Sequence, residues 1–271
     1  MTDLIPVRDI GQLRFVRPAD ERWILGLTWV PVSATEIHLA SRYYPLAVRF
    51  DGHMPRLGLI VDQCYLTYEV VDANGAWRGA YRPIALRCFP FEAPTLSDDP
   101  LVDIRIDICS RHLSAHDGAA LVDDTGRPSP LLTGLHRLFG LLKSSEESLA
   151  GVLDQFLMTG LLAPLGGDEA EAPPLYVFDP AKISQLTPKA LGAMARKNFH
   201  GIDIGLSGLF SLQRLRPERR PKAAERSDHP SAAVASIIPD IGTFDDLALD
   251  DGELIPLAEI GALVTGTVAT S

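Results

Sequence analysis

Cysteine is scarce in this chain of 271 residues, which contains only Cys64, Cys88 and Cys109. No two of them form a Cys-x-x-Cys pair, and the N-terminus has no basic stretch followed by a long apolar run. No signal peptide is therefore readable. An odd number of cysteines without a secretion signal predicts free thiols in a reducing compartment, which favours a cytoplasmic protein.

Long apolar runs and an excess of positive charge are also lacking. No run approaches the roughly 20 apolar residues that a membrane helix needs, so no membrane span is expected. The formal net charge of −10 argues against nucleic acid as the main partner. With 46% hydrophobic residues, the chain still has enough apolar side chains for a packed, soluble globular protein.

The common sequence motifs of enzymes are missing as well. There is no Gly-x-Ser-x-Gly nucleophile elbow, and Gly205-Leu206-Ser207-Gly208, which comes closest, lacks the strand–elbow–helix setting. Neither a glycine-rich phosphate loop nor a dinucleotide fingerprint occurs. These absences remove the common hydrolases, NTPases and dinucleotide enzymes, but they leave an enzyme of an unfamiliar type open.

The histidines give one arrangement that could bind a metal ion. His112, His116 and Asp117 would bring two imidazoles and a carboxylate together if their segment were helical, because positions i and i+4 share a face. Ser114 and Gly118 favour a loop there instead. We therefore predict no metal and no cofactor, and keep a metal-dependent oxygenase that uses these three residues as the alternative.

Arginine and aromatic side chains are concentrated in residues 75–91. Trp77, Arg78, Tyr81, Arg82 and Arg87 lie there between glycines and prolines. Guanidinium groups beside aromatic rings can hold an anionic or planar ligand by charge and stacking, so these five residues are the predicted ligand- or partner-binding site. If the segment from Pro83 is helical, Arg82 and Arg87 lie five residues apart and do not share a face. If it is a strand, the first two arginines share a face and the third points the other way. At most two of the three should therefore converge.

The same aromatic side chains could instead fill the core of a sheet, with the arginines packed along their faces at the surface. This interpretation is the favoured one, because large aromatic residues are more often core residues than ligand-binding ones. Trp77 follows the turn at Asn74-Gly75 and is expected to be largely buried. Its truncation to alanine would then cost about 3–5 kcal/mol.

The first half of the sequence is dominated by strand patterns and the second half by helical ones. Strands are expected at residues 13–16, 23–32, 47–50, 57–61, 66–72, 102–109 and 175–178. Helices are expected at residues 34–42, where Ser33 and Glu36 form a capping box, and at 129–157, 180–186 and 188–197. Residues 202–212 fit either state. This order predicts an α+β fold, in which an antiparallel twisted sheet from the N-terminal half is covered by helices from the C-terminal half.

The character of the sequence changes after Leu215. Residues 216–230 are basic, contain proline and lack periodicity, which is typical of a linker; acidic residues with scattered apolar side chains follow. We expect one domain at residues 1–215, and a linker with an acidic C-terminal tail at residues 216–271 that is dispensable for folding. The tail could dock on its own domain or on a partner, or it could be a frayed end.

Residues 75–91 resemble the signature of the bacterial SapC family. The run Gly75-x-Trp77-x-Gly79-x-Tyr81-x-Pro83 and the ending Arg87-x-Phe89-Pro90-Phe91 match that signature. Further matches follow in the order of the family over residues 4–215, at 30–32, 44–48, 161–165, 179–186 and 211–215. The resemblance supplies no metal motif.

The resemblance implies a helper protein rather than a defined reaction. Members of the family tend to be encoded near flavin-dependent tryptophan-halogenase-like proteins, cupin-like proteins and TonB-dependent receptors, which associates them with nutrient uptake or modification. We therefore predict a non-catalytic accessory protein that binds a halogenase-like or cupin-like enzyme, a peptide or a sugar. An enzyme with an unrecognised site is the alternative. A structural subunit that acts as a homo-oligomer is a third possibility.

Overall fold

A β-hairpin lies at the centre of the main sheet. In the computed structural model, which describes residues 4–165, 174–195 and 199–221, strand β4 (Leu46–Asp51) pairs antiparallel with strand β5 (Met54–Ile60) along its whole length. Gly52 turns the chain between them with a φ of 60°, a conformation that other residues rarely adopt. The predicted strand pair at residues 47–50 and 57–61 is confirmed.

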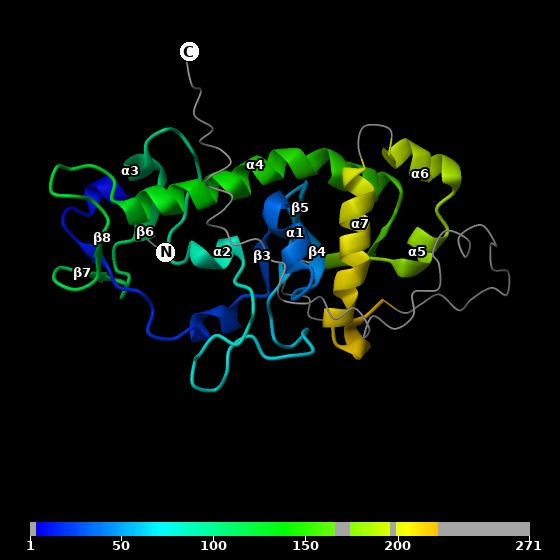
Figure 1. Cartoon of the computed structure of the whole chain (residues 1–271), viewed down its shortest axis with the longest axis horizontal. Helices are drawn as coiled ribbons and strands as arrows, with labels where there is room; N and C mark the ends of the chain where they lie inside the picture. Colours follow the sequence, from blue (N-terminus) through cyan, green and yellow to red (C-terminus); the bar gives the residue numbers. More distant parts are fainter. Residues whose placement is uncertain (1–3, 166–173, 196–198, 222–271) are drawn as a thin grey trace, which may run out of the picture. The chain divides into compact units, whose positions relative to one another are not determined.

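Three further strands complete a five-stranded antiparallel sheet with the order β3-β5-β4-β10-β9 (Figure 1). They are β3 (Trp29–Pro31), β9 (Leu162–Pro164) and β10 (Leu175–Phe178). The α+β fold class is confirmed. The sheet nevertheless takes β9 and β10 from the second half of the chain, where β10 pairs with the edge of β4 that would otherwise expose unpaired backbone groups.

The two faces of this sheet carry different cores. Leu46 and Val48 of β4 belong to the main core, which also contains side chains from the helices that cover the sheet. Ala47 lies between them and joins Trp29 and Leu215 in a smaller core. This alternation follows from the two-residue period of a strand, whose successive side chains point to opposite faces.

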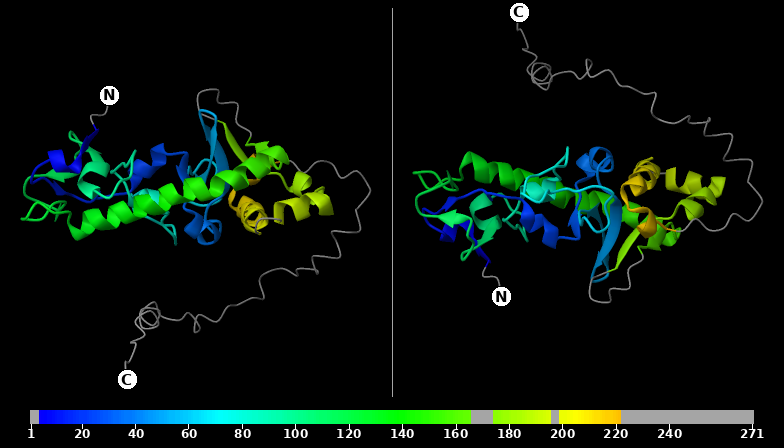
Figure 2. Two further views of the ribbon diagram at one scale, coloured as in Figure 1. Left: turned by 90° about the horizontal axis from the view of Figure 1, so that it is seen from above. Right: turned by 90° about the horizontal axis from the view of Figure 1, so that it is seen from below.

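One helix of 29 residues, α4 (Pro130–Met158), extends from the main core to a second core (Figure 2). Leu132 and Leu135 near its start pack in the second core, whereas Val152 and Phe156 near its end pack in the main core. The prediction of a helix at residues 129–157, with proline at its first position, is confirmed. A single helix therefore belongs to both cores.

Two small antiparallel sheets surround the second core. Strand β1 (Leu4–Pro6) pairs with β6 (Arg105–Asp107). Strand β2 (Arg14–Phe15) lies between β7 (Leu113–Ser114) and β8 (Ala119–Ala120). The short helix α3 (Pro100–Asp103) precedes β6 and contacts both α4 and β1.

Helix α7 (His200–Ser211) packs on β4 and β10, so the undecided segment at residues 202–212 is helical. The helix approaches the sheet closely at Gly208, where a Cβ atom would lie 2.1 Å from the ring of Phe178. Any larger residue would force the helix off the sheet. Glycine is therefore required at this position by packing.

The remaining helices are short. They are α1 (Ile37–Ala40), which continues a 3₁₀ turn at Ala34–Glu36, α2 (Ile84–Arg87), α5 (Pro180–Ser184) and α6 (Pro188–Ala195). The helices predicted at 34–42, 180–186 and 188–197 are confirmed where the structure describes them. Within the described ranges, no helix combines the length and apolar character needed to cross a membrane.

Three predicted strands are wrong in whole or in part. Residues 22–26 form a 3₁₀ helix, because the Asp20 carboxylate accepts the backbone N–H of Arg22 and starts a turn. Residues 66–72 form no strand and pair only through isolated bridges at Leu66 and Val71. Of residues 102–109, only β6 is a strand, because Asp99 caps helix α3 just before it.

Contacts with the domain continue beyond Leu215. Arg216 donates its backbone N–H to the Tyr65 carbonyl at 2.8 Å and its Nε to the Leu66 carbonyl at 2.9 Å. Arg220 donates its Nε to the carbonyl of Leu215 at 3.1 Å. The boundary after Leu215 stays a prediction, and these contacts suggest a second boundary a few residues later. The acidic tail lies outside the described residues.

Two shortened chains test the boundary. A chain ending at Pro221 keeps the contacts of Arg216 and Arg220, and should unfold cooperatively at the temperature of the full chain. A chain ending at Leu215 should still fold but lose about 1–3 kcal/mol, because buried carbonyls lose their donors. Differential scanning calorimetry measures both. If both chains aggregate, residues beyond Pro221 cover an apolar surface and the domain is larger than proposed.

Asp103 ties α3 to α4 through a buried carboxylate. It accepts the backbone N–H and the hydroxyl of Ser97 at 2.6 and 2.9 Å, and Nε2 of His136 lies 2.8 Å away. Burial raises the pKa of Asp103, but these hydrogen bonds outweigh burial and hold its pKa below the ordinary value of 3.8. The ionised carboxylate therefore stabilises the fold at neutral pH.

The Asp103→Asn variant should be less stable than the unchanged chain by about 1–3 kcal/mol at neutral pH, because the amide cannot accept all three hydrogen bonds. Since the folded-state pKa is depressed, the stabilisation is complete above about pH 4 and is lost as the pH falls through that pKa. Urea unfolding at neutral and acidic pH should therefore show the two stabilities converging in acid. A difference that does not change with pH would contradict this account.

Candidate functional site

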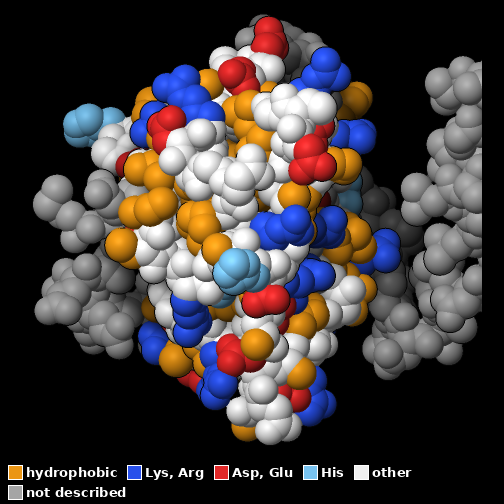
Figure 3. Space-filling model, turned by 90° about the vertical axis from the view of Figure 1, so that its left-hand side faces the viewer, with side chains coloured by type: hydrophobic (Ala, Val, Ile, Leu, Met, Phe, Trp, Pro, Cys, Tyr) orange, Lys and Arg blue, Asp and Glu red, His pale blue; other side chains and the backbone are white. Residues whose placement is uncertain are grey.

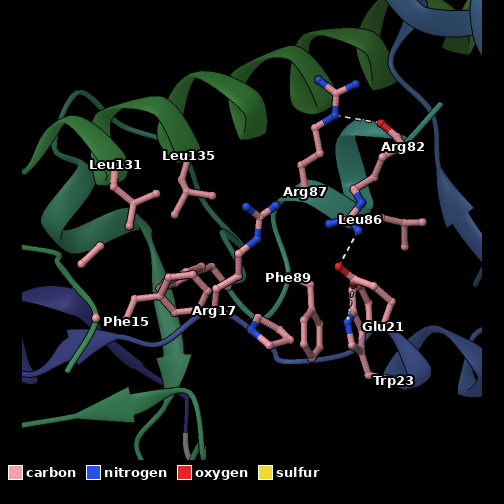
Figure 4. A pocket seen from close by; sticks show the side chains of 14 residues that line it. Phe15, Arg17, Glu21, Trp23, Arg82, Leu86, Arg87, Phe89, Leu131 and Leu135 are labelled. Atoms are coloured by element: carbon pink, nitrogen blue, oxygen red, sulfur yellow. Dashed lines mark hydrogen bonds and ion pairs between the residues drawn. The ribbon is translucent and has the colours of Figure 1, made fainter. Parts of the chain in front are cut away.

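A pocket with a volume of about 480 Å³ opens where the main core meets the second core (Figure 4). Leu86 in its wall belongs to the main core, whereas Phe91 and Leu135 belong to the second. The pocket is lined by 14 residues, most of them apolar or aromatic. Its volume is typical of sites that bind small molecules.

Two aromatic pairs form much of its wall. The rings of Trp23 and Phe89 are stacked, with centroids 3.7 Å apart and planes 8° from parallel. The rings of Phe15 and Phe91 meet at 58° with centroids 5.0 Å apart. Such pairs hold each other in fixed orientations, so the wall is a preformed aromatic surface.

Glu21 fixes one side of the pocket. One carboxylate oxygen accepts a hydrogen bond from Arg82, and the other accepts the indole N–H of Trp23 at 3.0 Å. The backbone N–H of Glu21 donates to the carbonyl of Gly75 at 2.8 Å. Both carboxylate oxygens of the single acidic residue in the lining are thus used: one pairs with Arg82, and the other orients the stacked indole.

Two further arginines in the lining have no carboxylate partner among the described residues. Arg87 donates its Nε to the carbonyl of Arg82 at 2.8 Å, and its guanidinium lies 5.3 Å from the centre of the Tyr81 ring. Arg17 is exposed and makes neither an ion pair nor a side-chain hydrogen bond within the described ranges. Among the described residues, these two positive charges in the lining are therefore uncompensated.

The buried carboxylate of Glu36 positions the helix that carries Arg87. It accepts the backbone N–H of Ser33 at 2.9 Å, the hydroxyl of Tyr81 at 2.6 Å and the backbone N–H of Ile84 at 2.9 Å. Burial, and next the hydrogen bond to Glu36, raises the pKa of Tyr81, so the phenol stays protonated and donates. The predicted capping box is confirmed, and the same carboxylate also holds the first turn of α2.

The structure brings two of the five predicted site residues to the pocket, Arg82 and Arg87. Arg78 pairs with Asp72 at 3.1 Å in the turn before it, and its side chain is 65% exposed. Trp77 and Tyr81 do not line the pocket; they lie beneath the guanidinium groups of Arg82 and Arg87, at 4.8 and 5.3 Å. Ligand binding by any of the five stays a prediction.

Trp77 is half-buried rather than largely buried, although it packs against the main core. The Arg82 guanidinium covers one face of its ring, 4.8 Å from the centroid. A long charged side chain can shield an aromatic face in this way while its head stays in water. The expected loss of stability on truncation of Trp77 is correspondingly at the low end of the range.

Sequence reasoning missed four polar or aromatic residues of the pocket: Phe15, Arg17, Glu21 and Trp23. They lie about 60 residues before the signature segment, and no spacing rule connects the two. The leucines of α4 were recognised only as a helical core stripe. The pairing of Glu21 with Arg82 exists only after folding, so no sequence motif could have indicated it.

His112, His116 and Asp117, the residues of the alternative metal site, lie in different surroundings. His112 is buried and meets the ring of Phe89 edge-on at 5.6 Å, and burial, together with the nearby Arg111, lowers its pKa. His116 and Asp117 lie in an exposed turn, where the hydroxyl of Ser114 accepts their backbone N–H groups. Over the parts of the chain that are described, no three His, Cys, Asp or Glu side chains are grouped to hold a metal ion.

Ser207, His38 and Asp203 are linked in a row, but the imidazole is reversed relative to a serine hydrolase, in which Nε2 faces the serine and Nδ1 faces the aspartate. The Oγ of Ser207 lies 3.2 Å from Nδ1 of His38, and Nε2 of His38 lies 2.9 Å from the Asp203 carboxylate. In addition, Ser207 lies inside α7, where the backbone N–H groups are used by the helix and cannot form an oxyanion hole. The His38 side chain is 65% exposed, and none of the three residues lines the pocket. The geometry favours a structural role, in which these hydrogen bonds join α1 to α7, over a catalytic one.

The fold and the pocket together define an α+β protein with an arginine-bearing aromatic pocket and no assembled centre of a familiar reaction among its described residues. The family model of SapC matches residues 9–216, and the chain belongs to the SapC family. No curated protein and no solved structure matches it. The signature segment at residues 75–91 supplies five lining residues of the pocket, namely Arg82, Leu86, Arg87, Phe89 and Phe91.

Variants of the Glu36 network should separate scaffolding from binding. Glu36→Ala leaves three donors without an acceptor, two of them buried backbone N–H groups, and should cost about 3 kcal/mol or more. Tyr81→Phe removes one donor but keeps the ring beneath Arg87, and should cost about 1 kcal/mol. Chemical unfolding measures both. Equal losses in the two variants would show that the hydrogen bonds to Ser33 and Ile84 contribute little.

Proposed function

We propose that this SapC-family protein is a non-catalytic accessory protein that binds an anionic ligand in the pocket between its two cores. The observation that carries the proposal is the presence of the Arg17 and Arg87 guanidiniums, which lack carboxylate partners among the described residues, at a preformed aromatic wall. Two uncompensated guanidiniums at one pocket attract a carboxylate, sulfonate or phosphate group.

Most of the formal net charge of −10 belongs to the acidic tail and to other residues outside the described ranges. Figure 3 shows basic and acidic side chains intermixed on one face of the domain. Local charge at the pocket, rather than the charge of the whole chain, would therefore attract an anion. Arg82 contributes less than the other two, because Glu21 compensates its charge. The apolar wall lowers the local polarity and strengthens the remaining attraction. Of the five predicted site residues, this proposal keeps Arg82 and Arg87, which line the pocket, and leaves out Trp77, Arg78 and Tyr81, which do not. It adds Arg17.

The wider role proposed from the family resemblance is assistance to nutrient uptake or to a partner modifying enzyme in the cytoplasm. A halogenase-like or cupin-like enzyme as partner belongs to the same proposal, whereas a structural subunit that acts as a homo-oligomer stays a separate possibility. The ligand would then be a compound that the accessory protein holds for, or receives from, that partner. The alternative of a metal-dependent oxygenase lacks a supporting cluster among the described residues.

An aromatic sulfonate probe, 8-anilinonaphthalene-1-sulfonate, tests the proposal. Arg17→Ala and Arg87→Ala should each weaken its binding about tenfold, since each removes a charge-assisted hydrogen bond. Arg78→Ala is the matched control, because this exposed arginine belongs to the same signature segment but pairs with Asp72 away from the pocket. Fluorescence titration gives the affinities.

The melting temperature must be compared in each variant, because a partly unfolded chain also binds this probe. Weakened binding with an unchanged melting temperature supports the proposal. Equal affinities in the arginine variants and the unchanged chain would contradict it.

A further inference from the structure

The polar groups of the pocket limit the kind of anion that it can hold. Its 14 lining residues include three arginines and one glutamate, and none carries a hydroxyl or amide side chain. Glu21 already accepts from Arg82 and Trp23. Of these polar groups, the guanidiniums of Arg17 and Arg87 have no carboxylate partner within the described ranges. A guanidinium offers two parallel N–H groups, which match the two oxygens of a carboxylate.

Ligands with many polar groups fit this lining poorly. A sugar would bury several hydroxyls, and each hydroxyl without a hydrogen-bond partner would weaken binding. A phosphate has more oxygens than a carboxylate, so more of its oxygens would lack a donor in a lining whose unpaired polar groups, among the described residues, are two guanidiniums. The sugar ligand considered from the family resemblance is therefore disfavoured by the chemistry of the lining.

The apolar part of the wall favours a flat, aromatic body. Phe15 and Phe91 lie on one side, and the Trp23–Phe89 stack lies on the other. Figure 4 shows Leu131 and Leu135 of α4 above Phe15, and the Arg17 guanidinium extending between Leu135 and Leu86. Aromatic rings pack on such walls edge-on or offset, with a gain beyond the area that they bury.

The volume leaves room for the occupant. About 480 Å³ lies within the usual range of small-molecule pockets and is ample for two fused rings with a short acidic group. The body would contact the aromatic walls and the leucines, while its acidic group reaches the arginines.

We propose that the ligand of this pocket is a planar aromatic carboxylate, whose carboxylate is held by Arg17 and Arg87 and whose rings pack against Trp23, Phe89 and Phe15. This assignment rests on the proposed anion-binding function and specifies its ligand class. Binding involves no covalent step.

Calorimetric titration of the full chain with 2-naphthoate tests the assignment. Saturable binding is expected at one site per chain, about tenfold or more tighter than that of 2-naphthalenemethanol, which lacks the charge. Decahydronaphthalene-2-carboxylate has the same carbon skeleton without aromatic rings, and should also bind about tenfold more weakly. Inorganic phosphate and glucose should not compete.

Substitutions in the lining test whether 2-naphthoate binds in this pocket. Arg17→Ala and Arg87→Ala should each weaken 2-naphthoate about tenfold and leave 2-naphthalenemethanol unchanged, whereas Arg78→Ala should change neither. Ala119→Phe places a ring in the pocket from an exposed position of β8, and should abolish binding of both naphthalenes. Melting temperatures confirm that each variant is folded.

The outcomes separate this inference from the function on which it rests. If the decahydronaphthalene acid or inorganic phosphate binds as tightly as 2-naphthoate, with the same dependence on Arg17 and Arg87, the aromatic assignment is overturned and the anion site stands. If 2-naphthoate, like 8-anilinonaphthalene-1-sulfonate, binds equally well to the arginine variants, both proposals are overturned.

Discussion

The buried carboxylate of Glu36 is the constraint on which the arrangement of the pocket depends. One carboxylate caps a helical turn at Ser33 and also holds Tyr81 and the first turn of α2. At the same turn, the hydroxyl of Ser145 in α4 accepts the backbone N–H of Ala34 at 2.8 Å. Removing a buried charge from water is costly unless each of its oxygens is hydrogen-bonded, as they are here. The main sheet, the signature segment and α4 are thus fixed relative to one another at one point.

The signature segment both packs against the main core and lines the pocket, so core packing and binding do not exclude each other. Trp77 and Tyr81 lie beneath the guanidiniums of Arg82 and Arg87, and both arginines line the pocket. An aromatic ring attracts a cation over its face and also restricts its motion. An arginine held in this way loses less conformational freedom when it binds an anion, because part of that freedom is already lost in the free protein. Arg17 lacks such a support and contributes charge alone.

Helix α4 explains why the pocket lies where it does. Its first turns pack in the second core through Leu132, and its last turns pack in the main core through Phe156. Leu131 and Leu135 lie near its start and line the pocket, so the helix forms one wall of the space between the cores. Two cores joined by one rigid helix leave a gap that their own side chains do not fill. Binding in that gap would bring additional contacts to both cores at once.

The sequence alone determined the α+β class, the β4–β5 hairpin, the capping box at Ser33 and the helix from Pro130, because each depends on neighbouring residues and on a short hydrophobic period. It also identified Arg82 and Arg87 through local composition. Only the tertiary structure decided that β10 joins the first-half strands, and that Glu21 and Trp23 meet the signature segment. Those pairings join residues far apart in the chain. They are selected by complementary charge and by ring packing, and neither leaves a periodic pattern in the sequence.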